Sequence, residues 1–506
     1  MPSILLLASF TPIFIILIGV LLLLNLDERI NRNLLSTFLL GIALLLNTML
    51  LIFYMLLDLR ERSFALNFEP GTFFIFEIIM LLGLFTLMFT KHEMMNVVNE
   101  RQMNSIIFLI LLSLIGTVLT SNILITITCF SLALFFIGAF FYFGEFTKDF
   151  ELLQWYFIGV GISVILLFFG SFFMIVETGT LLLTEILFLD LSPVSNFFIT
   201  SLFILGFGIP CGLFPFFIFH LKNYFQDSSY SSLILYFNLI SLTPVILLRS
   251  LSPFSFNHPP NGIFLLFVST ISLIISLIYI LTELFTSLDG DTFSIKKIYG
   301  FSLCADFNMT LLFISYLTIL NPLNNSIVYL NNVLFFLFSL TTLKILLLFS
   351  FFPIMLETFD DNFKLLGNFH EKYQKFSYIY PLSGIILSFP ISFIFLNNIM
   401  SIFSEEIIIS NSLYASLAFL MIGLFLFYLA INLILISTIY IQVYYGNVPR
   451  YIERDTIPKV KMVHFRPLIF IFFGLGLIIM LGLLDLLQIF GNPLFQIFKR
   501  FFLFIN

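Results

Sequence analysis

The sequence predicts an all-α polytopic membrane protein of about 14 transmembrane helices, built from two inverted five-helix repeats with breaks in helices 7 and 12. The composition, the spacing of the apolar runs and the position of helix-breaking residues carry this prediction. Hydrophobic residues make up 60% of the 506 residues and charged residues 10%. Because soluble domains keep about 25% charged residues, the chain is expected to lie in a bilayer. The lack of a basic domain excludes a nucleic-acid-binding protein.

Fourteen apolar runs are long enough to cross the bilayer core, which takes a helix of about 20 residues. The fourth and fifth runs are separated only by Thr120-Ser121-Asn122, so this turn must be tight. The thirteenth run is long enough to tilt or to extend past the bilayer. The runs cover residues 4–25, 34–57, 72–90, 104–120, 122–143, 152–176, 196–220, 231–249, 262–282, 298–320, 326–353, 377–400, 411–443 and 467–490.

Positive charges divide unequally between the two sides of these helices. When each loop is numbered by the helix it follows, odd loops hold 16 Lys and Arg residues, even loops with the C-terminal tail hold 5, and Lys344 completes the total of 22. Such a bias marks the inner side of a membrane, and one missed helix would scramble it. The bias therefore supports 14 helices with both termini on the outer side. The 5 are Arg60, Arg62, Arg249, Lys499 and Arg500.

The seventh run contains residues that should interrupt its helix. Three glycines, Pro210 and Pro215 lie within residues 204–220. In lipid, broken backbone persists only where protein or a watery cavity satisfies its polar groups. Transporters use such discontinuous helices at the membrane midplane. The run therefore predicts ion or solute handling inside the bilayer.

A second break is expected five helices later, at Pro381, Gly384 and Pro390. Since five is odd, two tandem five-helix units would insert with opposite orientations, which is the inverted-repeat plan of many transporters. Incidental proline, which membrane helices tolerate, is the alternative. The predicted domains are the N-terminal helices at 1–103, the first repeat at 104–249, the second repeat at 250–443, and a loop with the last helix at 444–506.

Ionisable residues inside the apolar runs are the candidates for chemistry, because a charge there costs roughly 2.5–3.5 kcal/mol. Lys344 lies near the middle of the eleventh run, where it either holds a transferable proton or is satisfied by a neighbouring helix. Asp306, one or two turns inside the tenth run, has a functional and a structural interpretation. Glu77 in the third run is a proton-relay candidate. His220 ends the broken seventh run, where imidazole suits proton transfer or a structural hydrogen bond.

No residue set predicts a metal, a nucleotide or covalent chemistry. Cys129, Cys211 and Cys304 each lie in an apolar run, and their spacing fits no zinc or iron–sulfur pattern. Glu177 and Glu283 end helices and are expected at the membrane interface. No nucleotide-binding loop or catalytic triad is present. We expect no metal ligand, no cofactor and no catalytic residue in this chain.

Several stretches resemble the antiporter-like membrane subunits of respiratory complex I. Residues 208–216 and 226–229 are similar to that family's helix 7–8 motif, and residues 297–309 to its helix 10. Residues 151–157 look most like NADH dehydrogenase (ubiquinone) subunit 2, whereas residues 443–447 are similar to subunit 4. We favour the subunit 2 branch, with subunit 4 second. The number of helices and the two breaks agree with the family fold.

The resemblance implies proton translocation coupled to electron transfer from NADH to ubiquinone in the mitochondrial inner membrane. FMN, iron–sulfur clusters and the quinone would belong to the rest of the complex. The implied partners are other membrane-arm subunits and the bilayer, with cardiolipin a candidate lipid. Odd loops would face the matrix and both termini the intermembrane space. The 72 Phe residues beside a single Trp favour an AT-rich organellar genome. The rival is a free-standing cation/proton antiporter or another secondary transporter.

This chain departs from the family at its charged positions. Asn and Thr bind water but cannot hold a proton at neutral pH, so the usual proton channel is in doubt. Two roles follow: a rerouted path through Lys344, Asp306 and His220, or a structural spacer. By alignment the family's charged residues of helices 5, 7, 8 and 12 and the histidine of helix 10 fall at Thr128, Pro210, Ile240 (with Asn238 nearby), Asn397 and Asp306.

Overall fold

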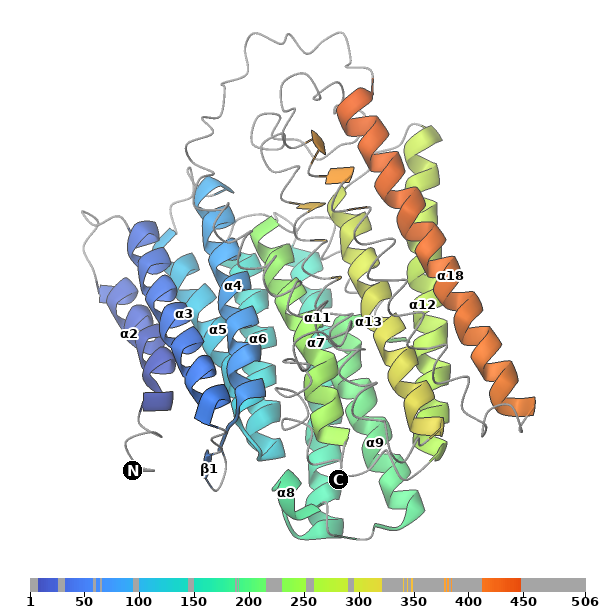
Figure 1. Ribbon diagram of the computed structural model, residues 1–506, viewed down its shortest axis with the longest axis horizontal. Helices are drawn as coiled ribbons and strands as arrows, with labels where there is room; N and C mark the ends of the chain where they lie inside the picture. Colours follow the sequence, from blue (N-terminus) through green and yellow to red (C-terminus); the bar gives the residue numbers. More distant parts are fainter. Residues whose placement is uncertain are drawn as a thin grey trace. The chain divides into compact units, whose positions relative to one another are not determined.

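The computed structural model confirms an all-α polytopic membrane protein. Ten of the described helices are long and apolar enough to cross a membrane, and neighbouring helices within each compact unit run side by side (Figure 1). The described residues form two compact units, one up to Leu265 and the other from Leu266 onward. The structure describes residues 8–25, 32–57, 61–63, 66–93, 100–143, 150–186, 189, 191–214, 230–251, 259–289, 295–320, 340, 344, 347–348, 377–378, 380–381, 384 and 412–446.

The ten spans coincide with predicted runs two to ten and thirteen. A shorter apolar helix, α2, lies on the first run. The eleventh and twelfth runs are described only at scattered residues, and the fourteenth lies outside the described residues. The elements are α2 (Thr11–Asn25), α3 (Arg32–Leu57), β1 (Glu61–Ser63), β2 (Leu66–Phe68), α4 (Pro70–Glu93), α5 (Glu100–Leu119), α6 (Ile123–Phe143), α7 (Phe150–Thr178), α8 (Leu183–Ile186), α9 (Pro193–Gly208), η1 (Ile209–Cys211), α11 (Tyr230–Leu251), α12 (Pro259–Asp289), α13 (Ile295–Leu320), α18 (Ser412–Tyr440) and η3 (Ile441–Tyr445).

The first unit is arranged around α11. This helix contacts α4, α5, α6 and α9, and every residue from Ser231 to Leu251 is buried. Outer helices instead keep apolar side chains exposed, such as Phe38 and Met49 on α3 and Phe172 on α7. In a chain of this composition, these exposed faces are the surfaces that lipid covers.

A small hairpin, which the sequence pattern does not predict, closes one end of the first unit. Strands β1 and β2 pair antiparallel, with Ser63 opposite Leu66. Leu66 also forms a bridge with Thr120, and Asn122 forms one with Leu182. The predicted tight turn is confirmed, since α5 ends at Leu119 and α6 begins at Ile123. These pairings give the backbone groups of three loops partners that lipid headgroups would otherwise have to supply.

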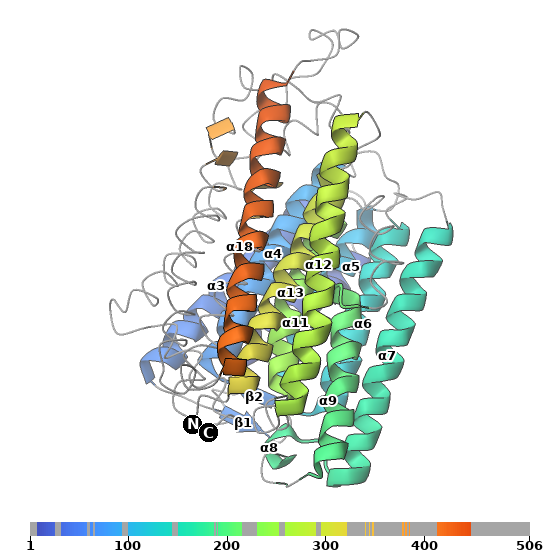
Figure 2. The same ribbon diagram turned by 90° about the vertical axis from the view of Figure 1, so that its right-hand side faces the viewer.

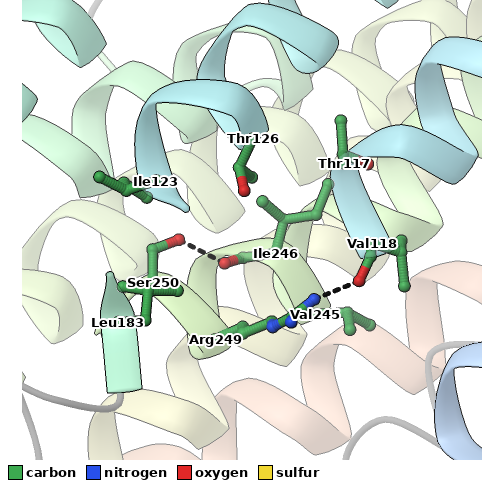
Figure 3. A pocket seen from close by; sticks show the side chains of 9 residues that line it. All are labelled: Thr117, Val118, Ile123, Thr126, Leu183, Val245, Ile246, Arg249 and Ser250. Atoms are coloured by element: carbon green, nitrogen blue, oxygen red, sulfur yellow. Dashed lines mark hydrogen bonds between the residues drawn. The ribbon is translucent and has the colours of Figure 1, made fainter. Parts of the chain in front are cut away.

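Arg249 ties this end of the unit to α11. It lies in the last turn of α11, is 6% exposed, and donates from Nη1 to the carbonyl of Val118 near the C-terminus of α5 (Figure 3). A cation at a helix C-terminus is favoured by the helix dipole. A small pocket adjoins it, lined also by Thr117, Thr126 and Ser250. Arg249, one of the five positive charges assigned to the outer side from the sequence, thus joins α11 to α5.

The predicted break in the seventh helix is present in α9. The α-helix ends at Gly208, a 3₁₀ turn (η1) covers Ile209–Cys211, and Gly212 adopts a left-handed conformation with φ 97°. The N–H groups of Gly212 and Leu213 bond to the carbonyls of Ile209 and Gly208, at 3.3 and 3.0 Å. This pair of bonds is a Schellman motif, and its left-handed position favours glycine. Pro215 lies outside the described residues.

The break leaves one carbonyl without its helical donor, and a neighbouring helix supplies the replacement. In an unbroken helix the carbonyl of Gly206 would accept from the N–H of residue 210, but Pro210 has none. The buried hydroxyl of Ser163 on α7 donates to this carbonyl at 2.5 Å. Helices α7 and α9 can approach this closely because glycine has no side chain. A Cβ at position 206 would lie only 2.6 Å from the Leu167 side chain. Another helix thus satisfies the broken backbone.

We expect Ser163→Ala to destabilise the protein by about 1–3 kcal/mol, because it leaves the Gly206 carbonyl buried without a donor. The measurement is the thermal midpoint of unfolding in detergent. Ser201→Ala is the matched control on α9: among the described residues Ser201 bonds to its own helix, at Phe197, and it is half-buried. Its effect should stay within about 0.5 kcal/mol. Equal effects of the two variants would contradict this role for Ser163.

The second unit contains α13 and α18, which lie alongside each other (Figure 2). Every residue of α13 from position 298 to 319 is buried. Helix α18 has 29 residues and continues into a π-helical turn, η3. At 1.5 Å per residue α18 is about 44 Å long, more than the roughly 30 Å of the bilayer core. The expectation that the thirteenth run extends past the core is consistent with this length.

Candidate functional site

Helix α13 carries Asp306 to the middle of the second unit. Asp306 is the twelfth residue of a 26-residue helix and is fully buried. At 1.5 Å per residue it lies about 16 Å from the start of the helix, roughly half the thickness of the bilayer core. Asp306 thus lies about three turns from the start of α13, which begins at Ile295, before the apolar run at 298. A carboxyl at this depth needs partners.

Lys344 is the main partner of Asp306. Its Nζ lies 2.6 Å from Asp306 Oδ1, and the two side chains are 3% and 0% exposed. The same Nζ donates to the carbonyl of Ser302, one turn earlier on α13, at 2.9 Å. The structure thus brings together two residues that the sequence singled out separately. A buried ion pair of this kind is kept only with good geometry and further hydrogen bonds.

Helix α18 supplies the remaining contacts. The Tyr428 hydroxyl donates to Asp306 Oδ1, the oxygen that also faces Lys344. Asn432, one turn further on, donates to the Tyr428 carbonyl at 3.1 Å and accepts from the Ser302 hydroxyl at 3.4 Å. The other carboxylate oxygen, Oδ2, is buried and has no hydrogen-bond partner within the described part of the chain. One oxygen of Asp306 is therefore held by two donors, and the other is open to a proton or a water molecule.

Glu77 lies in a separate site in the first unit. It is 7% exposed on α4, and its Oε2 accepts from Asn47 Nδ2 of α3 at 2.8 Å. Asn47 donates to the Phe73 carbonyl at 2.8 Å as well. Close by along α4, the Ile79 carbonyl accepts from Asn238 of α11 at 3.2 Å. Glu77 is thus held by neutral groups, in contrast to the charge pair at Asp306.

Of the other positions that the sequence singled out, the structure describes some, and others lie outside the described residues. Thr128 is exposed on α6 and bonds to the carbonyl of Ile125 in its own helix, so the residue aligned with the family's helix 5 glutamate does not face the core. Pro210 lies in the break of α9. His220, Pro390 and Asn397 lie outside the described residues.

The described residues hold no group of three or more His, Cys, Asp or Glu side chains that could bind a metal. Cys129, Cys211 and Cys304 form no disulfide in the described part of the chain, and Cys211 donates to the Thr243 hydroxyl at 3.1 Å. Glu283 lies 3.9 Å from Lys297, and Glu177 is exposed near the end of α7.

Tyr428 and Asn432 belong to the site but were not singled out from the sequence. Both residue types are ordinary in membrane helices, so neither attracts notice alone. A signal was available in their spacing, because residues four apart share one face of a helix. A polar pair at this spacing in an apolar run predicts a neighbour that needs hydrogen bonds.

Comparison with known proteins shows the fold. No protein-family model matches the sequence, and no curated protein matches it. A chain of respiratory complex I from Thermus thermophilus is similar in structure, with a TM-score of 0.63, 13% identity and coverage of 94% of this chain and 98% of that chain. A chain of the membrane-bound sulfane sulfur reductase, an archaeal respiratory membrane complex, gives a TM-score of 0.69 with 14% identity and coverage of 99% and 97%. The chain thus has the fold of membrane subunits of respiratory complexes.

Proposed function

We propose that this chain is an antiporter-like membrane-arm subunit of a complex I-type assembly, which couples electron transfer from NADH to quinone to proton translocation. The observation that carries the proposal is the end-to-end match: the fold spans 98% of a complex I chain. The same fold occurs in a sulfane sulfur reductase complex, so fold alone does not select the electron donor. The choice of NADH rests on the resemblance of residues 208–216 and 297–309 to the complex I family.

Within that family, the subunit 2 branch of the mitochondrial complex is our preferred assignment, with subunit 4 second. The chain would lie in the mitochondrial inner membrane with its odd loops toward the matrix and both termini toward the intermembrane space. The 16-to-5 division of positive charges supports this orientation. NADH, FMN, iron–sulfur clusters and ubiquinone would bind elsewhere in the complex. The partners of this chain would be other membrane-arm subunits and lipid, including cardiolipin.

The proton-handling group that we propose for this chain is the Lys344–Asp306 pair. The positions that carry charge in the family are neutral here at Thr128, Pro210 and Asn397. Lys344 and Asp306 meet at 2.6 Å deep in the second unit, and each can gain or lose a proton. Charged pairs inside membrane proteins mark proton relays in pumps and transporters. Glu77 and His220 are secondary candidates.

The proposal is tested by the size and activity of the assembly that contains the chain. An affinity-tagged chain, extracted in mild detergent, is run on a native gel and stained for NADH dehydrogenase activity. We expect co-migration with that activity in a complex of many subunits. Migration of the chain alone, with cation-dependent proton transport after reconstitution, would instead identify a free-standing antiporter. Co-migration with a large complex that lacks NADH dehydrogenase activity would point to another respiratory complex.

A further inference from the structure

A line of polar side chains follows the facing sides of α13 and α18. Within each helix the spacing is three, four or eight residues, which keeps the side chains on one face. All belong to the second unit. We call this line the α13–α18 polar seam and define it by Tyr299, Ser302 and Asp306 of α13, by Tyr428, Asn432 and Tyr440 of α18, and by Tyr444 of η3, which continues α18.

The deep end of the seam is linked by hydrogen bonds. Ser302 donates to Asn432 Oδ1, Asn432 donates to the Tyr428 carbonyl, and Tyr428 donates to Asp306. Each of these residues is at most 3% exposed. Tyr428 and Lys344 both face Oδ1 of Asp306, which leaves Oδ2 as the open acceptor at the end of the seam among the described residues.

The shallow end of the seam is a cluster of tyrosines. The Tyr299 and Tyr380 hydroxyls are 3.1 Å apart, and the Tyr380 ring stacks on Tyr440 with centroids 6.0 Å apart. Tyr444, in the π-helical turn η3, lies 5.5 Å from Tyr440. α13 begins after the ninth loop and η3 leads into the thirteenth, so this end lies on the odd-loop side. Tyr299, Tyr380 and Tyr444 are buried, and the cluster reaches the surface through Tyr440, whose hydroxyl lies 3.4 Å from that of the exposed Tyr445.

A single apolar side chain separates the two ends along α18. Ile436 lies four residues after Asn432 and four before Tyr440, so it occupies the same face. It is 8% exposed. Gly384, from the predicted twelfth helix, lies against it so closely that a Cβ at Gly384 would meet Ile436 Cγ2 at 2.5 Å. Ile436 therefore closes the seam between the tyrosine cluster and the ion pair.

We propose that the α13–α18 polar seam is a one-sided proton entry path from the odd-loop side to Asp306, closed at rest by Ile436. The proposal deepens the proposed proton-handling function and rests on it. A proton delivered by water on that side forms an O–H bond with Oδ2 of Asp306. The carboxylate becomes a neutral acid, and its attraction to Lys344 falls. Lys344 keeps its bond to the Ser302 carbonyl. No carbon bond changes, and nothing is oxidised or reduced.

Sided labelling of Asp306 tests the path. A hydrophobic carbodiimide reacts with a protonated carboxyl: the acid proton moves to a carbodiimide nitrogen, and the carboxylate oxygen bonds to the central carbon. The complex is placed in sealed vesicles of one orientation, and labelling of the Asp306 peptide is followed by mass spectrometry. A one-unit drop in pH raises the protonated fraction of a mostly ionised carboxyl about tenfold. We expect labelling to rise by up to that factor when the odd-loop side is acidified, and to stay constant when the other side is.

Two substitutions that should change the labelling of Asp306 in opposite directions distinguish a proton path from a general loss of structure. Asn432→Leu removes the polar step next to Tyr428 and should lower the labelling, whereas Ile436→Ala removes the closing side chain and should raise it. Ser437→Leu is the matched control, because Ser437 lies on the exposed face of the same helix. A response to the other side, no labelling at any pH, or equal shifts in both variants would overturn the path. Failure of the path in a complex that still migrates with NADH dehydrogenase activity would leave the proposed membership intact.

Discussion

Asp306→Leu is expected to destabilise the protein by about 3–5 kcal/mol, the cost of leaving one member of a buried ion pair without its partner. Lys344 would lose its 2.6 Å contact and retain the Ser302 carbonyl. With 3% of its side chain exposed, Lys344 cannot recover the lost interaction from water. The measurements are the thermal midpoint of the detergent-solubilised complex and the amount of complex that assembles.

A second substitution distinguishes the lost pairing from damage at position 306. Asp306→Leu combined with Lys344→Met removes both charges, and apolar side chains of similar volume can replace a buried pair at little cost. The double variant should therefore recover most of the stability. Glu283→Gln serves as the control, because it alters a longer contact of 3.9 Å to Lys297 and should change stability by about 1 kcal/mol or less. An Asp306→Leu cost no larger than that of the control would refute the role of the pair in stability.

The same double variant is expected to lower the number of protons translocated per NADH oxidised, while electron transfer to quinone continues. Neither leucine nor methionine can hold a proton, so any path that passes through the pair is interrupted. Because the double variant is expected to recover most of the stability, a transport defect in it would not be a consequence of instability. Proton uptake into sealed vesicles is measured with a pH-sensitive dye and divided by the NADH consumed.

The control for transport is Ser437→Leu, on the exposed face of α18. It should leave the proton ratio unchanged. If the double variant assembles normally and keeps the parent ratio, the Lys344–Asp306 pair is a structural element. The chain would then act as a spacer in the membrane arm rather than as a proton carrier. This is the second role that the sequence allows.

Most of the fold follows from composition and periodicity. A membrane helix satisfies its own backbone, so its position is set by local sequence, and ten predicted runs reappear as helices. The break at Pro210 is equally local. The hairpin of β1 and β2 was missed because its pairings with Thr120 and its neighbours join distant loops. Three-residue strands carry too little pattern to be recognised.

The candidate site was only partly predictable for the same reason. Lys344 and Asp306 are visible singly, because a charge in an apolar run is rare. Their pairing is not visible, since they lie 38 residues apart on different helices. Thr128 illustrates the limit of resemblance: alignment places it at a charged position of the family, yet its side chain is exposed on α6. At low identity, an alignment can preserve a helix while shifting the face that its residues present.

The bond between Ser163 and Gly206 also bears on the order of synthesis. Ser163 precedes Gly206 by 43 residues, so α7 leaves the ribosome before α9. Chains are made and folded from the N-terminus. The Ser163 hydroxyl therefore enters the membrane before the Gly206 carbonyl. The carbonyl, which lacks a helical donor, then inserts next to a hydroxyl that is already in place. Reversing the order of the two helices would expose an unpaired carbonyl to lipid during insertion, so the repair is tied to the direction of translation.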